Sequence, residues 1–157
     1  MIGDIALTNP QSRRGQGLVE FSLVTFMTVI MLLFVVEAAR MVLVYTSLAN
    51  AARAGVRYAV VHGSTRPTTG CAAVDCASGP GINPLQVVTV VQNFASAGLL
   101  SMSNLTVNVT YLGSSNAPGQ FVYIHVAYLY DPLTTYFSTI FPTALSLGSV
   151  AQGVIVF

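Results

Sequence analysis

Apolar residues dominate the chain between Gln16 and Val36, and no charge occurs from Phe21 onward in that run. As an α-helix the segment would be about 31 Å long, enough to cross the hydrocarbon core of a bilayer. No small-residue cleavage site of the secretory type follows the run, where the sequence goes on with Glu37. We therefore predict a transmembrane helix over residues 16–36 that the mature protein retains.

The helical pattern continues beyond the apolar run. No proline or other stop occurs before Gly63 and Pro67, which predicts one continuous helix from Gln16 to His62, about 70 Å long. Its second half is amphipathic, with a polar stripe made of Thr46, Asn50, Arg53 and Arg57. The opposite face consists of Leu48, Ala51, Ala52, Gly55 and Ala59. Such small residues let another backbone approach closely. The helix then packs either on the chain's own domain alone or on both that domain and neighbouring subunits.

A second, shorter helix is expected after a loop at 63–83 that is rich in Gly, Ser and Pro. It runs from Pro84 to Ala97, with Asn83 as its N-cap and Gly98 as its stop. Its predicted buried face consists of Leu85, Val88, Val91 and Ala95.

Three strands are expected in the rest of the chain. Leu105 to Leu112 alternates apolar and polar residues, Phe121 to Tyr130 is apolar on both faces, and Val150 to Phe157 forms the third strand. We predict an α+β domain in which a three-stranded antiparallel sheet packs on the amphipathic end of the long helix. The expected plan has three parts: a leader at 1–15, the long helix at 16–62 with its amphipathic part at 37–62, and an exported α+β domain at 63–157.

Composition limits the classes of protein that fit. The chain is 54% hydrophobic and only 7% charged, whereas an ordinary soluble domain has about 25% charged residues. Lysine is absent, and the net charge of +1 provides no basic stripe for nucleic acid. Lipid, neighbouring subunits or uncharged polar residues must therefore cover the surface.

The distribution of cations predicts the topology. Arg13 and Arg14 stand immediately before the apolar run, and the positive-inside rule places them with the leader in the cytoplasm. Arg40 on the far flank weakens this preference, but Glu37 precedes it by one turn and can pair with it. The expected location is the inner or cytoplasmic membrane, with the C-terminal domain exported.

Glu20 is the one residue of the apolar helix whose chemistry requires an explanation. A carboxylate in hydrocarbon is unfavourable by a few kcal/mol, so it indicates a functional role. If the chain is cut after Gly15, Gln16 becomes the N-terminus and its amine becomes a partner for Glu20, within one subunit or between two. The alternative is a carboxylate at the cytoplasmic interface that reaches water or Arg14.

The sequence contains no recognisable catalytic constellation. The carboxylates are Asp4, Glu20, Glu37, Asp75 and Asp131, and no two have a spacing that indicates general acid–base catalysis. His62 and His125 lack a nucleophile motif, and no phosphate-binding glycine loop is present. We expect no enzyme, no cofactor and no metal site, although a small membrane-anchored enzyme remains an alternative.

Three stretches, in this order, resemble the TadE-like family: Arg13–Phe21 (RRGQGLVEF), Val36–Arg40 (VEAAR) and Asn50–Ala59 (NAARAGVRYA). The residues that carry the likeness inside the helix are Glu37, Arg40, Asn50, Arg53, Gly55, Arg57 and Tyr58. The second stretch departs from the expected Glu-Phe-Gly-Arg, since the aromatic residue and the glycine are missing while both charges remain. The resemblance covers residues 13–62 and not the C-terminal domain.

The resemblance implies a minor pilin or pseudopilin of a Tad/Flp tight-adherence system, within the type IV filament superfamily. It implies cleavage by a prepilin peptidase between Gly15 and Gln16, and assembly through Glu20 and Phe21. A cut after Gly17 fits the family pattern less well. Other pilin-like subunits, a membrane platform protein and an assembly ATPase are the implied partners. The alternative is a single-pass anchor whose exported domain binds a ligand and never polymerises.

Cys71 and Cys76 form a short C-x4-C pair in the loop before the second helix. If the domain is exported to an oxidising compartment, this spacing predicts a local disulfide, and two unpaired thiols are the alternative. We expect non-reducing peptide mapping of the exported protein to show the two cysteines linked to each other. Free thiols at both positions would contradict the disulfide.

Overall fold

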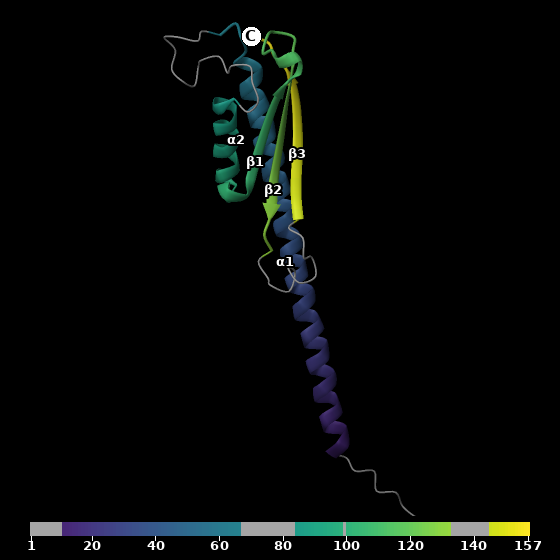
Figure 1. Ribbon diagram of the computed structural model, residues 1–157. Coiled ribbons are helices and arrows are strands. Elements are labelled where there is room, and N and C mark those ends of the chain that lie inside the picture. The colour runs from purple at the N-terminus through teal and green to yellow at the C-terminus, as the bar shows by residue number, and fades with distance from the viewer. Residues whose placement is uncertain (1–10, 67–83, 99, 133–144) are drawn as a thin grey trace, which may run out of the picture. The chain divides into compact units, whose positions relative to one another are not determined.

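The computed structural model describes residues 11–66, 84–98, 100–132 and 145–157 (Figure 1). The side chains of residues 11–14 are outside the description. Most of the predicted leader and the predicted Cys71–Cys76 disulfide lie outside the described residues. In chain order the main elements are α1, α2, β1, β2 and β3, which confirms the predicted α+β class.

Helix α1 spans Gln11–Val61 without interruption, so the prediction of one continuous helix is confirmed. It begins five residues before the predicted start at Gln16, and the Gly15–Gln16 peptide bond is therefore helical. The sequence offers no helix breaker between Pro10 and Gly15, which explains the earlier start. The chain divides into two compact units after Ala39.

The C-terminal end of α1 is held by side chains that satisfy its free carbonyls. The Nε of Arg66 donates to the carbonyl of Val61 at 2.9 Å, and the guanidinium lies 5.8 Å from the ring centre of Phe157. The ring of His62 stacks on Tyr58 with centroids 3.9 Å apart. A cation at a helix C-terminus is favoured because it faces the negative end of the helix dipole.

Helix α2 spans Leu85–Ala97, within one residue of its predicted bounds. Pro84 occupies the N-cap position, so the prediction of Asn83 as the N-cap was wrong. Gly98 follows the last turn, as predicted. The observed buried residues are Val87, Val91 and Ala95. Burial of Leu85 was a wrong prediction, because its side chain is 76% exposed. The buried stripe follows the i, i+4, i+8 positions from Val87 and leaves Leu85 on another side of the helix.

The sheet has three antiparallel strands, as predicted. Their order is β1-β2-β3, with β2 in the centre. Strand β1 spans Leu105–Tyr111 and β2 spans Phe121–Tyr130. Strand β3 spans Leu145–Val154, so the predicted range Val150–Phe157 was wrong by several residues. The reason is the pairing with β2, which uses all ten of its positions from Tyr130 opposite Leu145 to Phe121 opposite Val154.

Ile155 leaves the strand ladder and enters the core, where it is 1% exposed. Its N–H donates to the carbonyl of Gln120 at 2.9 Å, and its carbonyl accepts from the N–H of Gly119 at 2.8 Å. The next residue, Val156, donates to the carbonyl of Val60 at 3.0 Å. The end of the chain is therefore fixed to the β1–β2 connection and to the last turn of α1.

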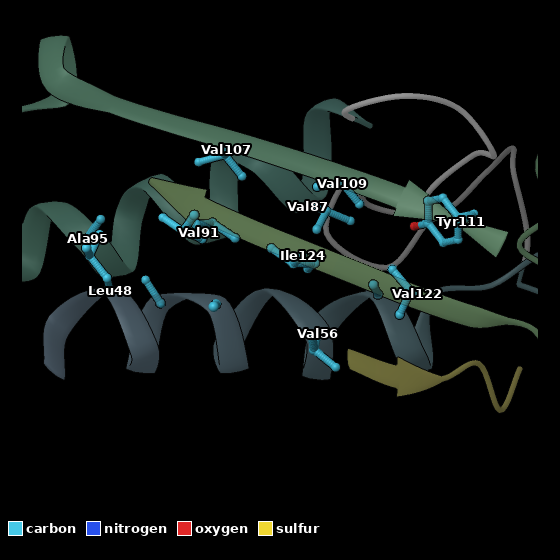
Figure 2. Packing of buried hydrophobic residues seen from close by; sticks show 14 of the residues in the cluster. Leu48, Val56, Val87, Val91, Ala95, Val107, Val109, Tyr111, Val122 and Ile124 are labelled. Carbon is cyan, nitrogen blue, oxygen red and sulfur yellow. The ribbon is translucent and has the colours of Figure 1, made fainter. Parts of the chain in front are cut away.

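The core lies between one face of the sheet and a helical layer formed by α2 and the second half of α1 (Figure 2). The sheet contributes the inward residues Val107, Val109, Tyr111, Val122, Ile124 and Val126. The predicted small-residue face of α1 is buried here, with Leu48, Ala51, Ala52 and Ala59 at 0% exposure. The structure shows this face packed against the chain's own domain.

Gly55 occupies the point where α1, α2 and β2 meet. A Cβ atom at this position would overlap Cγ2 of Val91 and would lie 2.9 Å from Cδ1 of Ile124. A similar close approach occurs at Gly153 of β3, where a Cβ would lie 2.6 Å from Cγ1 of Val56. Each of these two glycines thus allows an element of secondary structure to approach α1 closely.

We expect Gly55→Ala to lower the free energy of unfolding of the α+β domain by about 1–2 kcal/mol. Overpacking costs roughly 1–3 kcal/mol, and the two close contacts at Gly55 place it in the upper part of that range, at about 2–3 kcal/mol. The gain in helix propensity, about 1 kcal/mol, offsets part of this cost. Urea unfolding of the full chain in detergent measures the effect.

Gly17→Ala is the matched control, because a Cβ at Gly17 has nothing within 4 Å. The control should leave unfolding of the domain unchanged. Equal stability of the two variants would contradict the close approach at Gly55.

Candidate functional site

The first half of α1 presents an apolar surface that is largely exposed. All side chains from Gly15 to Val36 are exposed, and they include Phe21, Phe26, Met31 and Phe34 at 71%, 63%, 69% and 54%. By length and composition, α1 can cross a membrane, and none of its most apolar stretch is buried. Because water strongly disfavours so much exposed apolar area, this surface requires lipid or other apolar helices.

The predicted processing and assembly residues lie together at the start of this surface. Glu20 is exposed between Val19 at 66% and Phe21 at 71% exposure. Around Gly15, and likewise around Gly17, the space for a Cβ is open. The side chain of Arg14, the partner of Glu20 in the alternative interpretation, lies outside the described residues.

The next charged residues of α1 are Glu37, which is buried, and Arg40, which is half-buried. Glu37 is 2% exposed. The guanidinium carbon of Arg40 lies 5.5 Å from the ring centre of Tyr130, a cation–π arrangement. Arg40 also lines a pocket of about 270 Å³ together with Tyr128, Tyr130 and Asp131. The predicted pairing of Glu37 with Arg40 stays a prediction.

Three residues of the polar stripe in the second half of α1, namely Asn50, Arg53 and Arg57, line a groove against α2. The groove has a volume of about 790 Å³, and we call it the α1–α2 groove. Its α1 wall consists of Ser47, Asn50, Arg53, Ala54, Arg57 and Tyr58. The structure thus brings together four residues that the sequence singled out, namely Asn50, Arg53, Arg57 and Tyr58. Gly55, from the same stretch, lies on the buried side of the helix.

The other wall of the groove comes from α2, and the sequence analysis did not predict that α2 contributes to a site. Val90, Phe94 and Gly98 line it, and the side chain of Phe94 is 56% exposed. The sequence did contain one signal for this wall: Phe94 is a large aromatic residue that does not belong to the buried stripe of its helix. Gly98 closes one end, since a Cβ there would lie 2.8 Å from Oγ of Ser47.

The α1–α2 groove is electropositive. Among the described residues, Arg53 and Arg57 are the only charged ones that line it, and both are exposed. Four residues apart on one helix, they lie about 6 Å apart along its axis. Within 11–66, 84–98, 100–132 and 145–157, neither arginine forms an ion pair.

Two buried polar residues lie at the end of the domain where α1 stops. His62 is 7% exposed, and its Nδ1 lies 2.7 Å from the carbonyl of Tyr58. Asn116 is 4% exposed, and its carbonyl accepts from the N–H of Ser64 at 3.0 Å. In the part of the chain that the structure describes, no three His, Cys, Asp or Glu residues come together as metal ligands do.

Fold and surface together define a protein with one long apolar N-terminal helix that continues into a small α+β domain. The family model described as TadE-like protein matches residues 15–57, which confirms the resemblance predicted from the sequence. The matched segment contains Glu20 and the α1 wall of the groove up to Arg57. Neither the comparison with curated proteins nor the comparison with solved structures gave a match. The family suggests a component associated with a Tad pilus.

Proposed function

We propose that the chain is a minor pilin or pseudopilin-like subunit of a Tad/Flp-type pilus or secretion system. The observation that carries this proposal is the exposed apolar stretch of α1 with one carboxylate near its start, inside the segment that matches the TadE-like model. The protein has a structural role and carries out no reaction. A prepilin peptidase, other pilin-like subunits, a platform protein and an assembly ATPase are its proposed partners.

The apolar surface of α1 accounts for two successive environments of the subunit. In the membrane, lipid covers the exposed side chains between Leu18 and Val36; in a filament, the same side chains pack against helices of neighbouring subunits. Exchange of lipid for apolar protein contacts has little hydrophobic driving force of its own. Packing and the pairing of polar groups must therefore supply the preference for assembly.

Glu20 provides such a polar group. After a cut between Gly15 and Gln16, the carboxylate and the new amine lie about one helical turn apart. An unpaired carboxylate in an apolar bundle is costly, so pairing with the amine of an adjacent subunit would favour one stagger between helices over the others. Phe21, which directly follows, would contribute an aromatic contact to the same junction.

Cleavage at this site requires access to a peptide bond that lies in a helix. Gly15 and Gly17 flank the bond, and each glycine weakens a helix by about 1 kcal/mol relative to alanine. No side chain packs over either glycine. Local unwinding of this first part of α1 is therefore cheap compared with unwinding elsewhere in the helix.

We expect the protein isolated from native membranes to begin at Gln16 when its cognate peptidase is present. Intact-mass measurement with N-terminal sequencing, with and without the peptidase, checks this. Retention of Met1 in both backgrounds would remove the filament proposal and leave an uncut membrane anchor.

We expect Glu20→Gln to abolish or strongly reduce incorporation into filaments while insertion and cleavage continue. The substitution keeps the shape of the side chain and removes the charge that selects the stagger. The measurement is the ratio of sheared filament material to membrane material by immunoblot.

Ser22→Ala is the matched control on the same helix, because the Ser22 hydroxyl bonds only to the carbonyl of Val19, at 2.8 Å, within its own helix. The control should assemble normally. Normal assembly of Glu20→Gln as well would contradict the role of the carboxylate.

A non-polymerising membrane anchor is the second candidate function. One observation favours it: the small-residue face of α1, which the sequence also offered to neighbouring subunits, packs against the chain's own sheet and α2. An anchor of this kind would keep its membrane location and its binding activity in the Glu20→Gln variant.

A further inference from the structure

The α1–α2 groove carries chemistry that neither membrane insertion nor the packing of apolar helices uses. It combines two exposed guanidinium groups, an amide and an exposed aromatic ring in one hollow of about 790 Å³. We propose that this groove binds an acidic helical segment of a different protein, one that presents two carboxylates a single helical turn apart beside an apolar side chain.

The charges of the groove define the ligand class. Arg53 and Arg57 project from the same side of α1 one turn apart, and no carboxylate is among the lining residues that the structure describes. A guanidinium pairs best with a carboxylate, which it can bind through two parallel hydrogen bonds. Two carboxylates at i and i+4 on a partner helix have the same spacing, about 6 Å along the axis, as the two arginines. Asn50, one turn before Arg53, adds an amide that can donate to the same segment.

The opposite wall defines the rest of the ligand. Phe94 and Val90 of α2 line the same groove as the cations and give it an apolar surface, and Phe94 is 56% exposed. An arginine pair beside an exposed aromatic residue has the composition of the centre of a protein–protein interface. An apolar side chain of the partner, placed between its two carboxylates and the ring, would cover Phe94.

A second copy of this chain does not fit the groove. Its carboxylates are Asp4, Glu20, Glu37, Asp75 and Asp131, and no two of them lie within one helical turn in sequence. No single segment of a second copy can therefore neutralise both arginines. The partner must be a different protein.

A membrane surface fits less well than a protein segment. Recognition of anionic lipid headgroups typically uses clusters of four to eight Lys or Arg residues. The groove has two arginines, and lysine is absent from the chain. The hollow shape with an aromatic wall also favours a folded segment over a flat bilayer. The proposal applies equally to a filament subunit and to an anchor, because every lining residue belongs to the α+β domain and its share of α1.

The absence of lysine provides a sharp test. Arg53→Lys and Arg57→Lys each place the only side-chain amine of the protein in the groove while keeping the charge. A carbodiimide that joins amines to carboxylates, applied to native membranes, will then link the groove to whatever carboxylate lies in it. Arg66→Lys is the control, because Arg66 contacts Val61 and Phe157 at the end of α1.

The expected result is a linkage from positions 53 and 57, and not from position 66, to two acidic residues within one turn of the same segment of another protein. A linkage to Glu20 or Asp131 of a second copy would overturn the proposal in favour of self-association. A linkage to Asp75 of the same chain would show that the arginines are neutralised internally. A linkage to phosphatidylserine would show a membrane contact, and no linkage beyond that of the control would show an empty groove.

A second measurement uses a defined probe. The full chain in detergent is titrated with a labelled amphipathic helical peptide that carries Glu at i and i+4 beside leucine, and with the same peptide carrying Gln. We expect the Glu peptide to bind about tenfold more tightly, since each exposed pair contributes a modest share. The preference should disappear in the Arg53→Gln/Arg57→Gln protein. Equal binding of both peptides to the unmodified protein would overturn the proposal.

Discussion

The close approach between the second half of α1 and the chain's own sheet is the contact on which the domain depends. Ala51, Ala52 and Ala59 have almost no side chain, and Gly55 has none, so β2 and α2 reach the helix at this point. The sheet reciprocates at Gly153 of β3, opposite Val56 and Val60. The sheet buries the apolar residues of one face, and residues of α1 and α2 cover that face. Because α1 supplies one wall of the core, the domain has no complete core without it.

This arrangement separates the functions of one helix along its length and around its circumference. The first half has apolar residues on all sides, so it can meet lipid or other helices from any direction. The second half buries its small residues in the domain and turns Asn50, Arg53 and Arg57 outward. The same helix can therefore hold a membrane or filament contact at one end and offer a charged surface at the other.

The sequence predicted the parts of the fold that follow from local periodicity. The alternation in β1 and the two-sided apolar pattern of β2 gave the strand positions, and the small and polar faces of α1 were assigned correctly. The bounds of β3 failed because Leu145–Val154 contains Ser and Gly residues with weak strand propensity, and pairing with β2 overrides that propensity. The predicted burial of Leu85 was wrong for a related reason. In α2 several apolar stripes were possible, and only contact with α1 and the sheet selects the one through Val87.

The site was predictable only in part, because the groove requires two elements far apart in sequence. Periodicity placed Asn50, Arg53 and Arg57 on one stripe, but nothing in that stripe indicates what lies opposite it. Phe94 reaches the groove through the packing of α2 on α1, which Gly55 and Gly98 allow at their points of contact.

Scarcity of charge makes the two arginines informative. The protein has six cations and five carboxylates in 157 residues. Its fold therefore depends on few charged side chains. Arg40 lies against Tyr130 and Arg66 closes the end of α1, and both roles are explained within the domain. Arg53 and Arg57 have no comparable contact in the described part of the domain. Exposed arginine contributes little to stability by itself, so the packing of the domain does not account for two of them in one groove, whereas an acidic partner segment does.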